Sequence, residues 1–224
     1  MTPRSGSTYL ASLFERNSEL KIGEHFRIVK GSLEQRIAKY NSKKYDEYIR
    51  NIITDFSRNR VFGVKLDWIQ FAPVYYLGAY RHYFQDNRFV YLTRSNLVKQ
   101  AISGHIAAES GYYHSFYDNE DAVLNVAYDF DKIDKHLNHL LEMMRAWESF
   151  FAYEGITPLR ITYEAIQEKP AEVMRQLFRF CEMDDQSEIM TKTSVERVCS
   201  RLNEDFYMRF VKESEYKIDR IELN

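Results

Sequence analysis

Short apolar runs alternate with longer amphipathic stretches along this chain of 224 residues. The runs suit buried strands, while the stretches between them repeat their apolar positions every three to four residues, as helices do. Four runs stand out, at residues 20–22, 61–66, 89–93 and 159–162. Their alternation with helical patterns predicts an α/β fold, in which a mostly parallel sheet is flanked by helices on both faces.

The clearest helix is predicted over residues 131–154. Its apolar side chains form one stripe at helical spacing, made of Ile133, Leu137, Leu140, Leu141, Met144, Trp147, Phe150 and Phe151. Gly155 follows the stripe and suits the helix end, because glycine readily adopts the left-handed backbone of a helix C-terminus. Such a stripe indicates a core or dimer contact, and we assign it no chemistry.

Composition narrows the class of protein. Apolar residues make up 45% of the chain, and 31 Lys and Arg residues stand against 33 Asp and Glu residues, giving a net charge of −2. This balance disfavours general nucleic-acid binding. The sequence shows no repeat and no Pro/Gly-rich linker, so we predict one domain over residues 1–224. It also shows neither a transmembrane-length apolar run nor a signal sequence, which predicts a cytoplasmic protein.

Cysteine and histidine spacing predicts no metal site. The two cysteines, Cys181 and Cys199, lie far apart and are expected to be reduced thiols. His136 and His139 are three residues apart in the predicted helix, where a solvated face explains them better than a metal does.

The chain opens with a small-residue loop, PRSGST at residues 3–8, that runs directly into a helical pattern. Gly6 lets the backbone turn, and the free amides of a helix that begins near Ser7 face back into the loop. Hydroxyl groups surround the turn, from Ser5, Ser7 and Thr8. With Arg4 beside it, this helix start suits an anion, although Ser7 or Thr8 as an ordinary helix cap is the alternative. Ser7 stands where the ATP-binding loop has lysine, which disfavours a nucleotide kinase.

A second feature suited to anions follows the run at residues 89–93. Arg94 leaves this predicted strand at its carboxyl end, the sheet edge at which ligands bind and at which the loop of residues 3–8 is also expected. Ser103 lies nine residues further on, on the following predicted helix. The guanidinium and the hydroxyl together suit a phosphate. The alternative is a surface ion pair for Arg94 and a packing contact for Ser103.

These motifs resemble the PAPS-dependent carbohydrate sulfotransferases, and within them the bacterial trehalose 2-sulfotransferase family. The resemblance is carried in order by PRSGST at 3–8, FGVKLDW at 62–68, YLTRSNLVKQAIS at 91–103, and WESFF with ITYEAIQEKP between residues 147 and 170. A looser likeness covers nearly the whole chain. It implies a three-layer, P-loop-like α/β fold and suggests a homodimer.

The resemblance implies transfer of a sulfuryl group from 3′-phosphoadenosine 5′-phosphosulfate (PAPS) to a carbohydrate or glycolipid hydroxyl, without a metal. In the family's pattern, the loop from Arg4 to Thr8 holds the 5′-phosphosulfate. Arg94 and Ser103 hold the 3′-phosphate. Tyr163 matches a position near the adenine, and a packing tyrosine at the strand end is the alternative.

Sulfuryl transfer also needs a base for the acceptor proton and positive charge for the leaving phosphate. Arg4 is expected to supply charge. Glu24 is the expected base, because it follows a short predicted strand at the same sheet edge, and His25 beside it is the rival. The family has two acidic residues in a longer version of this turn, and Glu24 could match either. Lys65 is expected to pair with a phosphate or an acceptor group, or only with an acid such as Asp67.

One departure from the family concerns the strand before the loop. Family members have a buried apolar strand there, whereas this sequence has only Met1 and Thr2. Without that strand, neighbouring backbone groups stay unpaired and the loop is poorly anchored. We therefore expect a truncated chain or, as the alternative, another segment in the strand's place. This keeps open a degenerate relative that binds nucleotide or a protein partner without catalysis, with a nucleotide-dependent kinase the least favoured function.

Overall fold

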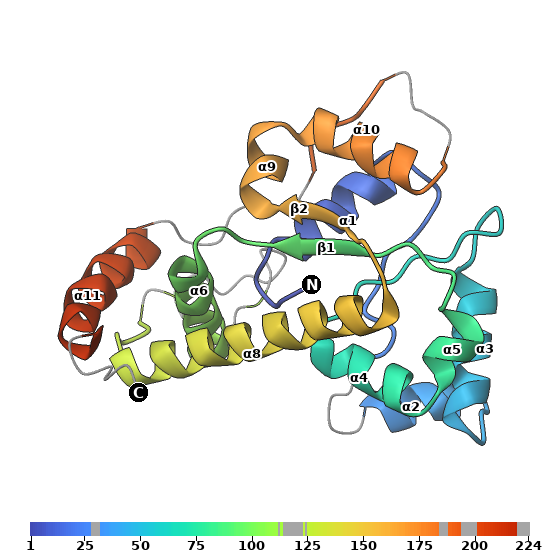
Figure 1. Ribbon diagram of the computed structural model, residues 1–224, viewed down its shortest axis with the longest axis horizontal. Helices are drawn as coiled ribbons and strands as arrows, with labels where there is room; N and C mark the ends of the chain where they lie inside the picture. Colours follow the sequence, from blue (N-terminus) through green and yellow to red (C-terminus); the bar gives the residue numbers. More distant parts are fainter. Residues whose placement is uncertain are drawn as a thin grey trace.

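The structure is a computed structural model that describes residues 1–27, 32–111, 113, 123, 125–183, 188–193 and 201–218. Helices dominate it (Figure 1), and they are α1 (Ser7–Arg16), α2 (Ser32–Lys39), α3 (Tyr45–Phe56), α4 (Trp68–Tyr76), α5 (Ala79–Tyr83), α6 (Leu97–Ser110), α8 (Phe130–Glu154), α9 (Tyr163–Glu168), α10 (Pro170–Phe180) and α11 (Arg201–Ile218). The strands β1 (Val90–Thr93) and β2 (Leu159–Thr162) form a small parallel sheet. The predicted α/β class is confirmed in this helix-rich form.

The sheet lies between two helical layers. Successive side chains of a strand point to opposite faces, and β1 follows this rule with Tyr91 and Leu92. Tyr91 packs against Phe151 of α8, with ring centroids 5.3 Å apart. Leu92 belongs instead to the apolar cluster that contains Phe14 of α1 and Phe178 of α10. Figure 1 shows the same arrangement, with α1 and α10 on one side of β1 and α8 on the other.

Helix α8 is the predicted long helix and runs through two of the apolar clusters. Near its C-terminal end, Trp147 stacks on Phe71 of α4 at a centroid distance of 4.9 Å. Near its N-terminal end, Ile133 joins the cluster formed with α6 and α11. Gly155 ends the helix with φ of 65°, as expected. A helix that spans both clusters fixes their spacing, because its own length hardly changes.

The buried stripe of α8 differs from the predicted one at two positions. Leu141 is exposed, whereas Met143 is buried in place of Met144. Position 143 follows Leu140 by three residues and precedes Trp147 by four, so it lies on their face of the helix. The prediction of Met144 for the buried stripe was wrong, because Met143 lies on the buried face of α8.

The two other predicted strands do not form as regular strands. One parallel bridge joins Gly23, directly after residues 20–22, to Val64, and the Lys65 amide donates to the Gly23 carbonyl at 3.1 Å. A cavity of about 540 Å³ separates residues 61–66 from β1. Residues 61–66 are therefore not paired with β1, and the two predicted strands stay without a longer ladder.

Three further findings concern the sequence expectations. Within the described ranges, no helix is both long and apolar enough to cross a membrane. Burial raises the pKa of the Cys181 thiol, and Cys199 lies outside the described residues. His136 packs beside Gly104, and burial lowers its pKa. In the part of the chain that the structure describes, no three His, Cys, Asp or Glu side chains are grouped so that they could hold a metal ion.

Replacement of Asp129 tests how α8 begins. The Asp129 carboxylate accepts a hydrogen bond from the Lys132 amide at 3.0 Å and so caps the helix. Asp129→Ala is expected to lower the free energy of unfolding by about 1 kcal/mol, because the first-turn amide loses its partner. Asp129→Asn, which can still cap, is the matched control. Chemical denaturation measures both, and equal stability of the two variants would contradict this role.

Candidate active site

The loop of residues 3–8 ends at the start of α1, as predicted. Gly6 is the N-cap residue, with φ of 85°, and α1 begins at Ser7. Gly6 has no side chain, so no side-chain oxygen caps the first amides of α1. The alternative, in which Ser7 or Thr8 is an ordinary helix cap, is not what the structure shows. A helix start left open in this way can bind an anion through its amides.

Helix α6 holds the beginning of this loop in place. The amide nitrogen of the Gln100 side chain donates to Thr2 Oγ1 at 2.8 Å and to the Pro3 carbonyl at 2.5 Å. Ser5 Oγ donates to the Thr2 carbonyl at 2.7 Å. Thr2, Ser5 and Gln100 are all buried. The Ser5 hydroxyl is thus used to shape the loop, and α6 fixes the loop against β1, which it follows in the chain.

Strand register brings Arg94 and Tyr163 to the same place. Thr93 pairs with Thr162 at the end of the sheet, so the next residue of each strand leaves the edge beside the other. The Arg94 guanidinium carbon lies 5.0 Å from the centre of the Tyr163 ring. A Cβ atom added to Gly6 would lie 2.4 Å from Tyr163 Cδ2. The ring therefore contacts the loop, and glycine is required at position 6 both for its left-handed backbone and for this close approach.

Arg4 reaches from the loop to α6. Its Nε donates to Ser103 Oγ at 3.1 Å, and its Nη1 donates to the Tyr113 carbonyl at 2.5 Å. Burial and the nearby Arg94 guanidinium lower the pKa of Arg4. Its positive charge is therefore disfavoured where it stands, and a bound anion would relieve that cost. Arg4, predicted for the 5′ end of the donor, thus lies beside Arg94 and Ser103, predicted for its 3′-phosphate.

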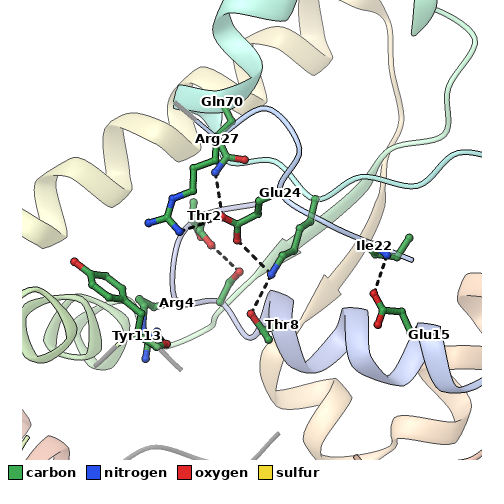
Figure 2. A network of polar contacts seen from close by, with 11 residues as sticks. Thr2, Arg4, Thr8, Glu15, Ile22, Glu24, Arg27, Gln70 and Tyr113 are labelled. Atoms are coloured by element: carbon green, nitrogen blue, oxygen red, sulfur yellow. Dashed lines mark hydrogen bonds and ion pairs between the residues drawn. The ribbon is translucent and has the colours of Figure 1, made fainter. Parts of the chain in front are cut away.

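Glu24 is joined to the loop through Lys65. The ammonium Nζ of Lys65 lies 3.2 Å from Glu24 Oε1 and donates to Thr8 Oγ1 at 3.0 Å. On its other oxygen, Glu24 accepts from Gln70 Nε2 at 3.4 Å and pairs with Arg27 at 3.7 Å. Figure 2 shows Glu24 at the centre of these contacts, with Thr8 at the end of the row.

Lys65 pairs with Glu24 and not with Asp67, and the ring of His25, the rival base, packs against an aromatic side chain. Asp67 is the N-cap of α4, where it accepts from the Gln70 amide at 2.8 Å, and the acid paired with Lys65 is Glu24. The His25 ring packs against Phe56 at a centroid distance of 4.0 Å. Of the two neighbouring candidates, it is Glu24 whose side chain is brought to the loop.

The sequence analysis did not identify two polar residues near this site, Gln70 and Glu164. Gln70 is 5% exposed and donates to Glu24, and its only sequence signal is a polar side chain in an otherwise apolar segment, WIQFAPVYY. Glu164 accepts from both the amide and the hydroxyl of Ser95, each at 3.0 Å. These bonds tie the turn after β1 to the start of α9. The signal for Glu164 lies in the paired strand ends, because Ser95 and Glu164 each stand two residues beyond the Thr93–Thr162 pair.

Comparisons with known proteins identify the family of this chain and support its fold. The family model of the Stf0 sulphotransferases matches residues 1–213. The chain is also similar to a solved structure, the crystal structure of a sulfotransferase from Alicyclobacillus acidocaldarius, with a TM-score of 0.53. The match covers 99% of this chain and 94% of that chain. At 16% sequence identity, this similarity supports the fold alone. No curated protein sequence matches the chain. Because the family model spans all but the last residues, this chain belongs to the Stf0 sulphotransferase family.

Proposed function

We propose that this protein transfers a sulfuryl group from PAPS to a hydroxyl of a carbohydrate or glycolipid acceptor. One observation carries the proposal: two guanidiniums and an open helix start meet at the sheet edge, and Lys65 connects the same loop to the carboxylate of Glu24. Donor-binding groups and a general base thus lie at one place. Family membership supports a sulfotransferase. The donor is inferred from these groups, and the carbohydrate or glycolipid acceptor is inferred from the family resemblance.

The donor site follows from the charges and donors of the cluster. We assign the 5′-phosphosulfate to Arg4 and to the backbone amides at Ser7 and Thr8, where the helix start favours negative charge. The 3′-phosphate is assigned to Arg94 and Ser103. The Ser103 hydroxyl accepts from Arg4 and keeps its own proton to donate to a phosphate oxygen.

The adenine is assigned to the neighbourhood of Tyr163, because this ring lies beside the phosphate-binding groups. The ring is held against Gly6 on one side, and the Arg94 guanidinium lies 5.0 Å from its centre. An adenine near Tyr163 would place its ribose phosphates next to the two arginines. This proximity supports the assignment of Tyr163 to the donor site, and a packing tyrosine is the alternative.

The transfer step uses the row of contacts around Glu24. The acceptor oxygen attacks sulfur while Glu24 takes its proton, so that the new O–S bond forms as the S–O bond to the donor phosphate breaks. The leaving phosphate gains negative charge, which Lys65 and Arg4 can offset. Because Lys65 contacts both Glu24 and Thr8, it couples the base to the phosphate loop. This division of roles favours an enzyme over a relative that only binds nucleotide.

Binding of the product, 3′-phosphoadenosine 5′-phosphate, is expected to raise the midpoint of thermal unfolding. At about 100 times its dissociation constant, a ligand adds about 2.7 kcal/mol of stability. Arg94→Ala is expected to abolish the shift, whereas Arg81→Ala, which removes a surface arginine paired with Glu154, should keep it. Magnesium-ATP and AMP serve as nucleotide controls. A full shift in Arg94→Ala would contradict the donor assignment.

Replacement of Glu24 separates catalysis from binding. Glu24→Gln is expected to reduce kcat by about 10²- to 10⁴-fold, the usual contribution of a general base, and to keep the thermal shift with the bisphosphate. Glu172→Gln, at an exposed carboxylate paired with Lys169, is the matched control and should retain turnover. Steady-state kinetics with a carbohydrate acceptor measure both variants. Unchanged turnover in Glu24→Gln would exclude Glu24 as the base.

Gln70 positions Glu24, and a pH profile tests this role. Gln70→Glu places a second carboxylate against Glu24, and a like charge disfavours the ionised base. The acid limb of the kcat/KM profile is therefore expected to move to higher pH. Gln70→Met, which is uncharged and similar in size, should lower kcat/KM with a smaller shift of that limb. An acid limb that stays in place in Gln70→Glu would show that Gln70 has no electrostatic contact with the base.

A further inference from the structure

Arg4 differs from the other polar residues of its loop in having a left-handed backbone. Its φ is 62°, a region that residues with a side chain rarely adopt, whereas Gly6 nearby adopts it without strain. A backbone of this kind persists only where the surrounding structure holds it, and such residues are concentrated at functional sites. The contacts that hold Arg4 therefore indicate its role.

The side chain of Arg4 extends towards the residues assigned to the 3′-phosphate. Its Nε donates to Ser103 Oγ at 3.1 Å, and its Nη1 donates to the Tyr113 carbonyl at 2.5 Å. Figure 2 shows Arg4 next to Tyr113. Ser103 belongs to α6, whereas the backbone of Arg4 lies beside the start of α1, where the 5′-phosphosulfate is assigned. One side chain thus connects the two phosphate positions of the donor site.

A second guanidinium lies beside Arg4. Burial lowers the pKa of Arg4, and the nearby charge of Arg94 lowers it further. Among the described residues, no carboxylate acts on Arg4 to offset this effect. Glu164 interacts with Arg94, but its carboxylate accepts from the amide and the hydroxyl of Ser95. An anion that contacts both guanidiniums relieves their repulsion, and a phosphate has the charge to neutralise both.

Arg4 and Ser103 can bind such an anion without losing their own contact. A guanidinium has five N–H donors, and the bonds to Ser103 and to Tyr113 use two of them. The Ser103 hydroxyl accepts from Arg4 and keeps its proton to donate. A phosphate can therefore contact both side chains at once, with the guanidinium already held in place by α6. Such pre-organisation reduces the cost of binding.

We propose that Arg4 determines the specificity for the 3′-phosphate of the donor, which it binds together with Arg94 while Ser103 and the Tyr113 carbonyl hold its guanidinium in place. This inference rests on the proposed function and extends it, because the loop arginine is assigned there to the 5′-phosphosulfate alone. A guanidinium that contacts both phosphates makes the two ends of the nucleotide bind as one unit. A nucleotide without a 3′-phosphate leaves the repulsion between Arg4 and Arg94 in place and binds weakly.

The test measures how much the 3′-phosphate adds to affinity. This contribution is the Kd of AMP divided by the Kd of 3′-phosphoadenosine 5′-phosphate, because the two ligands differ only in the 3′-phosphate. Isothermal titration calorimetry on the full chain gives both constants. The ratio is expected to be at least about 10² for the unmodified chain, since each contact with a charged group contributes about tenfold or more.

Replacement of Arg4 is the central comparison. Arg4→Asn removes the guanidinium, and asparagine tolerates the left-handed backbone better than most residues do. This variant is expected to lower the ratio at least about tenfold, as Arg94→Ala does. Arg16→Ala, which removes an exposed arginine in the last turn of α1, is the matched control and should leave the ratio unchanged. If Arg4→Asn weakens both ligands equally, Arg4 serves the 5′-phosphate alone and the proposal fails.

A double variant tests whether Ser103 holds Arg4 at the 3′-phosphate. Ser103→Ala and Arg4→Asn are each expected to lower the ratio. Combined, they should lower it by less than the product of the two single effects, because both remove the same hydrogen-bonded unit. A combined effect equal to that product would show that the two residues act independently, and it would overturn the shared site.

Two further measurements separate this proposal from the proposed function and from misfolding. Thermal unfolding without ligand shows that each variant is folded. Arg4→Lys keeps a positive charge but has no planar guanidinium, so it should lose more affinity for the bisphosphate than for AMP. A ratio that falls in Arg94→Ala but stays unchanged in Arg4→Asn and Arg4→Lys would support the donor site and overturn the role of Arg4. No binding of the bisphosphate to the unmodified chain would overturn both.

Discussion

The pairing of β1 with β2 is the constraint on which the candidate active site depends. Because Thr93 lies opposite Thr162, the residues after each strand emerge side by side, and Arg94 meets Tyr163. Glu164 then accepts from Ser95 across the same edge, which holds the two turns together. A slip of one residue would send these side chains to opposite faces of the sheet. Strand register thus determines where phosphate-binding groups can gather.

The ammonium group at the loop comes from a residue outside the loop. An ATP-binding loop carries its own lysine, and here Ser7 occupies that position. The ammonium comes instead from Lys65, which donates to Thr8 and pairs with Glu24. Arg4 adds a guanidinium whose charge is disfavoured by burial and by Arg94. Such a site gains by binding a multiply charged anion, and its cation also contacts the carboxylate that would take the acceptor proton.

Local patterns in the sequence were sufficient for the parts of the fold that form from neighbouring residues. The loop before α1, the strands β1 and β2, and the long helix α8 all follow from apolar spacing and glycine positions. Segments 20–22 and 61–66 have the composition of strands, but a ladder also depends on a neighbour that sequence pattern does not place. Gln70 was missed for the same reason: its role comes from contact with Glu24, which is distant in the chain.

The most direct test of the account is the structure of this protein bound to 3′-phosphoadenosine 5′-phosphate. The account predicts the 5′-phosphate at the amides of Ser7 and Thr8 and the 3′-phosphate within hydrogen-bond distance of Arg94 and Ser103. The adenine should contact the Tyr163 ring, and Glu24 should face the space beyond the 5′-phosphate. A bisphosphate bound away from the start of α1, or one whose 3′-phosphate contacts neither Arg94 nor Ser103, would contradict the central claim.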